Sequence, residues 1–247
     1  MHLKTQDKVM NNVRYPVIDW FRGFAILLMV IYHLCYDLDV FGYIDTVFGT
    51  GYWVPFRYVI VISFLLLVGL SLQFVHYKKI NVKNVKVRTL QLGLASAVVT
   101  ISSYFIAPQK ATLFGILHLI LLASWLGLLF INRPKLSAIA GTTIFALGHF
   151  VETKLFDSNW LHWIGMVEYV RPALDYAPLF PWFGVVLWGI ALGYVIQCNV
   201  FISRSLLNIN VTQSKFNSFL NWAGKHSLII YLIHQPLMYG VLMVVSG

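Results

Sequence analysis

Long apolar runs separated by short polar segments recur along the whole chain. Seven of these runs are about 16 to 25 residues long, near the length of helix that crosses the hydrocarbon core of a bilayer. The pattern predicts an all-α, polytopic membrane helical bundle with about seven transmembrane helices. The predicted spans are residues 17–37, 52–77, 89–107, 112–131, 136–151, 179–198 and 222–246, of which 136–151 is the shortest.

Composition supports a membrane protein. The chain has 247 residues, of which 59% are hydrophobic and 11% are charged, and its mean hydropathy is +0.74. Soluble domains carry about 25% charged residues, so this class is excluded. The first span is not a cleaved signal peptide, because Arg22 and His33 lie inside it and no small-residue cleavage site follows. We expect one integral-membrane domain over residues 1–247, with residues 1–14 as a polar cytoplasmic tail.

Basic residues fall mainly on one side of this topology. With the N-terminus in the cytoplasm, fourteen Lys and Arg residues lie on the inner side and four on the outer side. Membrane proteins retain positive charge on the cytoplasmic side, so we predict an N-in, C-out protein with an odd number of spans. The basic inner surface reflects topology and attraction to anionic lipid, or else it docks a phosphate-bearing cytoplasmic ligand. Nucleic acid is not an expected partner, because no soluble domain is present to bind it.

The first span carries four ionisable residues, which are costly inside a bilayer and mark functional sites there. A helix turns about 100° and rises about 1.5 Å per residue, so Arg22 and His33 share one face about 16 Å apart along the axis. Asp19 precedes Arg22 by three residues, and Asp37 follows His33 by four, so each carboxylate can reach its neighbour. The span therefore presents a polar stripe that must face protein or water.

Four histidines, His33, His118, His149 and His234, fall at middle to outer depth on four different spans. One histidine in a helix bundle is usually a packing residue, but four at one depth favour a functional site. Imidazole titrates near neutral pH and suits a general base or a proton shuttle. Asp37, one turn beyond His33, would orient that ring and stabilise its cationic form.

Arg22 presents a planar fork of donors that suits a phosphate, a carboxylate or a carbonyl-rich arm. The alternative is a structural ion pair with Asp19. A metal site is not expected, because no HExxH motif or paired-histidine motif accompanies the helical pair His33 and Asp37.

Two proline-containing segments predict irregular helix, which is tolerated at membrane depth where it is buried in protein or lines a cavity. Pro181 precedes Trp182 at the outer end of the 179–198 span. Pro236 follows His234 and Gln235 and is expected to interrupt the last span.

These segments resemble the transmembrane acyltransferases. The motif DxxRGxAI, which begins at Asp19, is followed by His33 eleven residues after Arg22, and this resembles the opening helix of that superfamily. The later segments FGILHLI, PLFPWFG and GKHSLIIYLIHQP resemble signatures of one branch, the heparan-alpha-glucosaminide N-acetyltransferase catalytic-domain family. The resemblance extends over residues 14–240.

The resemblance implies a multi-pass enzyme that takes an acetyl or other acyl group from cytoplasmic acyl-CoA and transfers it to an acceptor, often a sugar, across the membrane. It implies that His33 is the catalytic histidine and Arg22 its paired arginine, with His118 and His234 in the pocket. Acyl-CoA is the expected co-substrate, without a metal. Fuller members of the family have additional helices, so a homo-oligomer is a candidate arrangement for enclosing the reaction path.

We therefore predict a multi-pass cell-membrane acyltransferase with His33 as general base, Asp37 as a second catalytic residue and a glycan-like acceptor amine or hydroxyl. A proton-coupled transporter or channel could use the same polar stripe, although no inverted repeat is visible. A scaffold whose charges are merely paired is a further alternative. The residues predicted to bind acyl-CoA or substrate are Asp19, Arg22, His118, His149, Trp182, His234 and Gln235.

Overall fold

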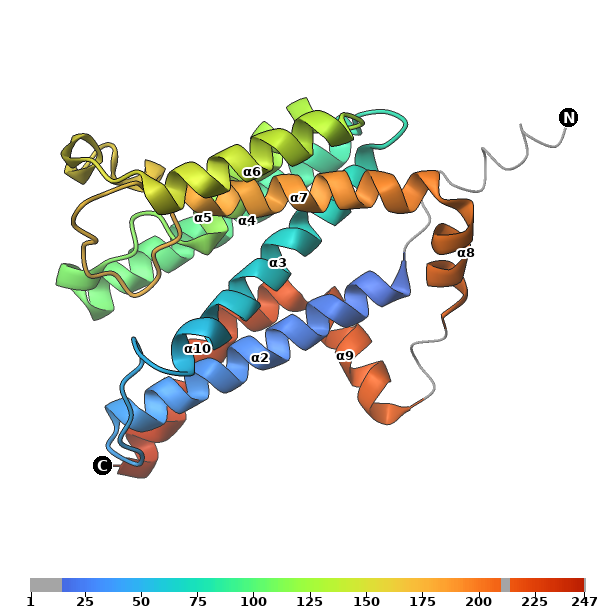
Figure 1. Cartoon of the computed structure of the whole chain (residues 1–247). Coiled ribbons are helices and arrows are strands. Elements are labelled where there is room, and N and C mark those ends of the chain that lie inside the picture. The colour runs from blue at the N-terminus through green and yellow to red at the C-terminus, as the bar shows by residue number, and fades with distance from the viewer. Residues whose placement is uncertain (1–14, 210–213, 247) are drawn as a thin grey trace, which may run out of the picture. The chain divides into compact units, whose positions relative to one another are not determined.

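The chain folds into helices, and the longest described connection between them is the segment 151–178 (Figure 1). A computed structural model describes residues 15–209 and 214–246, so the predicted polar tail, residues 1–14, lies outside the described residues. Helix accounts for 77% of the structure and no strand occurs in the described ranges, which confirms the all-α prediction. The chain divides into two compact units, a central unit that contains Leu65–Ser203 and a terminal unit that contains Tyr15–Phe64 and Arg204–Gly247.

The terminal unit combines helices from both ends of the chain. Its helix α2 packs against α9 and α10, which lie beside it in Figure 1. A buried apolar cluster of Ile26, Met29 and Ile60 joins α2 to the first half of α3. The helices are α2 (Pro16–Val40), α3 (Trp53–His76, residues 53–64 in this unit), α9 (Lys215–Lys225) and α10 (Ser227–Ser246).

Helices α2 and α9 cross at two glycines. A Cβ built at Gly23 would collide with the carbonyl oxygen of Leu220, and one built at Gly224 would collide with the carbonyl oxygen of Asp19. Only glycine lets two helix backbones approach this closely, an arrangement known from transmembrane helix pairs. The side chain of Asn221 also donates to the carbonyl oxygen of Pro16 at 3.0 Å, so α9 is held against the first turns of α2.

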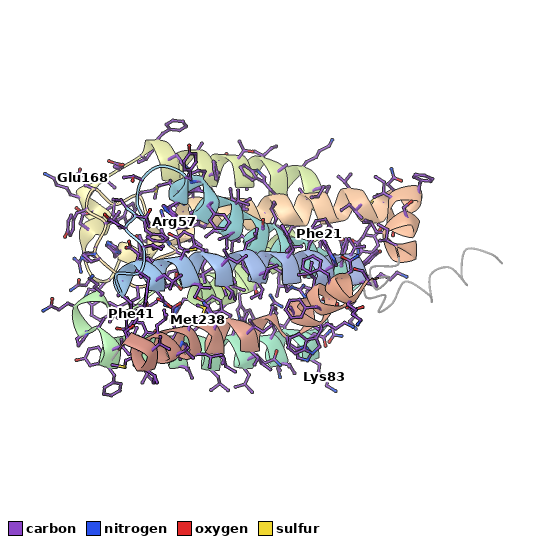
Figure 2. The ribbon with its side chains drawn as sticks, turned by 90° about the horizontal axis from the view of Figure 1, so that it is seen from below. Phe21, Phe41, Arg57, Lys83, Glu168 and Met238 are labelled. Carbon is purple, nitrogen blue, oxygen red and sulfur yellow. The ribbon has the colours of Figure 1, made fainter. Side chains whose placement is uncertain are left out.

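Helices α2 and α10 run in the same direction. His33 contacts His234, and farther along both helices the rings of Phe41 and Tyr239 have centroids 5.0 Å apart. Figure 2 shows Phe41 and Met238 toward the same end of the pair. The N-terminal ends of α2 and α10 therefore lie on the same side of the terminal unit, and the two helices also end on the same side.

The central unit is built around α7, whose residues Val185, Val186, Leu187 and Ile190 are fully buried. Helices α6 and α7 pack side by side (Figure 1). Glycines again set the close approaches, Gly141 to α7 and Gly189 to α3. The elements are the rest of α3, α4 (Val82–Ile106), η1 (Pro108–Lys110), α5 (Ile116–Gly127), η2 (Leu128–Phe130), α6 (Pro134–Phe150), η3 (Lys154–Asp157), η4 (His162–Ile164), α7 (Leu179–Cys198) and the start of α8 (Val200–Asn208).

Five helices of the described chain, α2, α3, α4, α7 and α10, are long and apolar enough to cross a membrane. Of the other two predicted spans, 112–131 contains the 12-residue helix α5 followed by η2, and 136–151 coincides with the 17-residue helix α6. The last span was predicted to begin at residue 222, but residues up to Lys225 belong to α9, and α10 begins at Ser227. The close crossing of α9 with α2 explains why the chain turns at residue 226 and why α10 begins later than predicted.

The two proline-containing segments behave differently. Phe180, just before Pro181, has the extended angles φ −94° and ψ 130° inside α7, as expected of a break. The break expected at Pro236 is wrong, because α10 continues as helix on both sides of that residue. Apolar membrane helices tolerate an internal proline where neighbouring groups satisfy the freed carbonyl.

Candidate functional site

His33 projects from the middle of α2 toward α10. Its Nδ1 atom lies 2.9 Å from the carbonyl oxygen of Met29 and 3.3 Å from Nε2 of His234. A carbonyl oxygen can only accept, so Nδ1 of His33 carries the proton in this arrangement. Among the described residues no hydrogen bond reaches Nε2 of His33, which is left with its lone pair.

His234 is buried on α10 and is fixed in the complementary state. Its Nδ1 atom donates to the carbonyl oxygen of Tyr231 at 2.7 Å, so its Nε2 atom is unprotonated and accepts from Nδ1 of His33. The two imidazole centroids are 4.9 Å apart at an angle of 65°. Each ring therefore carries its proton on Nδ1. The lone pair on Nε2 of His234 accepts from His33, whereas the lone pair on Nε2 of His33 is left free among the described residues.

Asp37 and Gln235 form a second connection between α2 and α10. Nε2 of Gln235 donates to Oδ1 of Asp37 at 2.7 Å, and Asp37 is only 1% exposed. Asp37 was expected to orient His33, but its hydrogen bond goes to Gln235, and His33 is oriented by Met29 and His234 instead. Neither Oδ2 of Asp37 nor Oε1 of Gln235 has a donor among the described residues, although both atoms are buried.

Asp19 and Arg22 form the ion pair that their spacing predicts. Nη1 of Arg22 lies 2.8 Å from Oδ1 of Asp19, and the two side chains are 25% and 5% exposed. Because α2 is a regular helix from Pro16 to Val40, the pair lies about 16 Å before His33 along the helix axis. The polar stripe of α2 is therefore present, with an ion pair at its start and an imidazole pair farther along.

Aromatic rings surround this end of α2. Tyr32 meets the edge of His33 at a centroid distance of 5.6 Å and also contacts Phe48, Trp53 and Phe56. All four contacts are T-shaped with centroids 5.6–5.9 Å apart, an arrangement that aromatic rings prefer. Sequence reasoning missed this cluster, because Phe48 lies in a connecting segment that has no periodicity.

The central unit holds the other predicted residues. His118 accepts from the backbone N–H of Gly115 at 3.3 Å through Nδ1, so its Nε2 carries the proton and donates to Oγ1 of Thr100 at 3.2 Å. Both ring nitrogens are therefore used within that unit. His149 is exposed and donates to the carbonyl oxygen of Phe145 at 3.0 Å, and Trp182 is half-buried in the first turns of α7.

The connection between α6 and α7 is ordered by polar contacts. Arg171 donates to the carbonyl oxygen of Asp157, and the hydroxyl of Tyr176 donates to the carbonyl oxygen of His162 at 2.8 Å. Burial, and then the nearby carboxylate of Asp157, raises the pKa of Tyr176 to about 12. Its phenol therefore stays a neutral donor at physiological pH.

A groove of about 780 Å³ lies between α6 and α7 in the central unit, lined mostly by apolar side chains with Lys135, Tyr194 and Asn199. It contains none of the predicted site residues. Among residues 15–209 and 214–246, no group of three or more His, Cys, Asp or Glu side chains is arranged to hold a metal ion.

These features define a multi-pass helical membrane protein in which the first and last long helices bring two imidazoles and a carboxylate–carboxamide pair together. The chain matches the family model described as heparan-alpha-glucosaminide N-acetyltransferase, catalytic, over residues 14–236. It belongs to this family of membrane acetyltransferases, which confirms the resemblance seen in its motifs. Neither the curated proteins nor the solved structures contain a match.

Proposed function

We propose that the protein transfers an acetyl or other acyl group from cytoplasmic acyl-CoA to an acceptor on the opposite side of the membrane, with His33 as the general base. The observation that carries this proposal is the free lone pair on Nε2 of His33, held in place by Met29 and His234. The match to an acetyltransferase family supports the same chemistry.

In the proposed reaction, Nε2 of His33 removes the proton of an acceptor amine or hydroxyl. The acceptor nitrogen or oxygen attacks the thioester carbonyl carbon, the carbon–sulfur bond breaks, and the CoA thiolate leaves and takes up the proton. His234 accepts a hydrogen bond from Nδ1 of His33 and stabilises the imidazolium, the role that a carboxylate has in a catalytic triad. A covalent acyl-imidazole on the same Nε2 atom is an alternative order of the same steps.

Asp37 and Gln235 would serve the acceptor. Each has a buried oxygen without a donor among the described residues, and buried acceptors of this kind are costly unless they are hydrogen-bonded. An amine or a hydroxyl-rich glycan supplies such donors. We therefore assign the acceptor to a sugar or glycan class and place its donors beside these two oxygens.

Arg22, with Asp19, would bind the acyl-CoA arm near the start of α2. Its guanidinium is partly exposed and presents a planar fork of donors that suits a phosphate or a carbonyl-rich arm. We further propose that His118, which the family resemblance places in the pocket, lines the path of acyl-CoA or acceptor together with His149 and Trp182.

The decisive experiment measures transfer of label from [¹⁴C]acetyl-CoA to amino sugars and glycans in membranes that contain the wild type or His33→Ala. General bases contribute about 10²- to 10⁴-fold, so the variant should lose activity by that factor. The matched control is His226→Ala, because His226 makes the same Nδ1 contact with a carbonyl four residues earlier but lies outside the site. Equal activity of wild type and His33→Ala would refute the assignment. Label on the wild-type protein that acid or neutral hydroxylamine releases, and that His33→Ala does not acquire, would identify the covalent order.

The proposal includes an N-in, C-out topology with seven spans in a single cell-membrane domain, in which α5 with η2 and α6 are the two shorter spans. The parallel direction of α2 and α10 supports an odd number of crossings. A homo-oligomer would supply further enclosure of the reaction path.

A proton-coupled transporter or channel is the second candidate. The contact between two imidazoles favours it, because a proton can pass from one ring to the other along the polar stripe of α2. Uptake of a substrate into proteoliposomes in the absence of acyl-CoA would support this function, and transfer of acetyl label without such uptake would exclude it.

A further inference from the structure

Helix α9 carries a row of aromatic side chains that protein does not cover. Phe216, Phe219 and Trp222 are 56%, 50% and 52% exposed. At about 100° per residue they fall within an arc of about 120° on the helix surface. We call these three residues the aromatic ridge. An exposed apolar ridge on a helix marks an interaction surface.

An adjoining face of α9 is packed within the terminal unit. Leu220 and Ala223 are 0% and 2% exposed, and Gly224 meets the backbone of α2. The side chain of Asn217 accepts from the indole N–H of Trp20 at 3.1 Å. These contacts fix the rotation of α9 about its axis, so the aromatic ridge keeps its exposed orientation.

Helix α9 lies at the end of the terminal unit where two membrane-spanning helices begin. It packs on the first two turns of α2, and α10 begins two residues after α9 ends, so it lies level with the starts of two helices that can cross a bilayer. Phe21 and Phe24, on the adjacent turns of α2, are 50% and 39% exposed (Figure 2 labels Phe21). Aromatic residues gather at this depth in membrane proteins, at the boundary of headgroups and acyl chains.

The charges of α9 fit the same location. The helix carries Lys215 and Lys225 at its two ends and no acidic residue. A helix with one apolar aromatic face and flanking lysines lies in the plane of the interface and prefers anionic lipid.

We propose that α9 is an interfacial helix whose aromatic ridge inserts into the anionic lipid of the membrane surface, while Lys215 and Lys225 bind lipid phosphates. The occupant of the ridge is the bilayer, because the surface is continuous with the apolar faces of α2 and α10 and its charges are only positive. This contact anchors the starts of the two helices that carry His33 and His234.

The test places a nitroxide label on single cysteines along α9 and measures its collisions with oxygen and with a water-soluble nickel complex. The protein, with Cys35→Ala and Cys198→Ser, is reconstituted in vesicles of zwitterionic phosphatidylcholine with about three parts in ten of anionic phosphatidylglycerol. Labels at 216, 219 and 222 should collide more with oxygen than with nickel. The label at the exposed position 218 is the matched control and should lie shallower. All four positions are exposed, so substitution there leaves the packed face intact.

A second arm tests the lysines. In vesicles that contain phosphatidylglycerol, the label at 219 should lie deeper than in pure phosphatidylcholine, and Lys215→Gln with Lys225→Gln should abolish this difference. Free access of nickel to 216, 219 and 222 would show that the ridge faces water and would overturn the proposal. Low collision with both reagents would show that protein covers the ridge, which overturns it equally.

Discussion

Nδ1 of His33 and Nε2 of His234 lie 3.3 Å apart although 201 positions separate the two residues in the chain. Each ring is also bonded to a backbone carbonyl of its own helix, Met29 for one and Tyr231 for the other. The tautomers of both rings follow from these contacts, and so does the assignment of the free lone pair to His33.

The contact predicts a graded effect of substitutions at His234. Replacement by Leu removes one of the two acceptors near Nδ1 of His33, leaving only the carbonyl oxygen of Met29, and should lower kcat by about tenfold, part of the ~10²-fold or more that a general base supplies. The KM for acyl-CoA should change little. His234→Asn offers a side-chain oxygen and should recover part of the loss. An equal loss in the Leu and Asn variants would contradict a hydrogen-bonding role.

Gln235 and Asp37 should be coupled in stability. Gln235→Leu leaves a buried carboxylate without its donor and should cost about 1 to 3 kcal/mol in the free energy of unfolding, measured by denaturation in detergent. Replacing both residues by Leu removes both partners of the hydrogen bond. The double variant should therefore lose less free energy of unfolding than the two single variants lose together. Additive effects would indicate that the hydrogen bond contributes nothing.

Exchanging the charges of Asp19 and Arg22 separates the ion pair that stabilises α2 from the proposed binding of acyl-CoA by Arg22. Asp19→Arg combined with Arg22→Asp can restore the ion pair and therefore the stability lost in either single variant. The KM for acyl-CoA should remain raised by about 10- to 100-fold, the equivalent of one charge-assisted hydrogen bond. Recovery of both stability and KM would show that the arginine serves only to pair with Asp19.

The crossing of α2 and α9 should tolerate no side chain. Gly23→Val or Gly224→Val would force the two helix backbones apart. The cost in free energy of unfolding should reach or exceed the upper end of the roughly 1 to 3 kcal/mol typical of overpacking, so we expect little folded protein. Gly93→Ala is the control, because nothing lies near a Cβ at that position. Size-exclusion profiles in detergent distinguish the outcomes, and a monodisperse Gly23→Val protein would contradict the crossing.

The parallel pair predicts the sidedness of the C-terminal end. In a background without Cys35 and Cys198, a cysteine at Ser246 should react with an impermeant maleimide from outside the cell, and one at Lys215 should react only after the membrane is opened. Reaction of both from the same side would show that α10 does not cross the membrane.

Local spacing predicted much of the fold and part of the site. The ion pair of Asp19 and Arg22 follows from a separation of three residues on one helix, and the apolar runs located the helices. The contact of His33 with His234 could not be predicted, because it depends on which helix packs against α2. Asp37, four residues beyond His33, was the nearest partner that the sequence offered for His33, but its carboxylate accepts from Gln235 of α10 instead.

The start of the last helix was missed for a related reason. Residues from 222 onward are apolar enough to continue a span, and only the contact of Gly224 with α2 reveals that the chain turns at His226. Hydropathy registers the composition of a segment but not the backbone against which it packs.

The pairing of α2 with α10 also orders events during synthesis. The ribosome makes His33 early and adds His234 after 201 further positions, a delay of about 10 to 40 s at 5 to 20 residues per second. Throughout that interval the first helix sits in the membrane with its imidazole unpaired and its carboxylate without Gln235. A nascent chain that stalls before residue 234 therefore has neither the contact between the two imidazoles nor the hydrogen bond between Gln235 and Asp37.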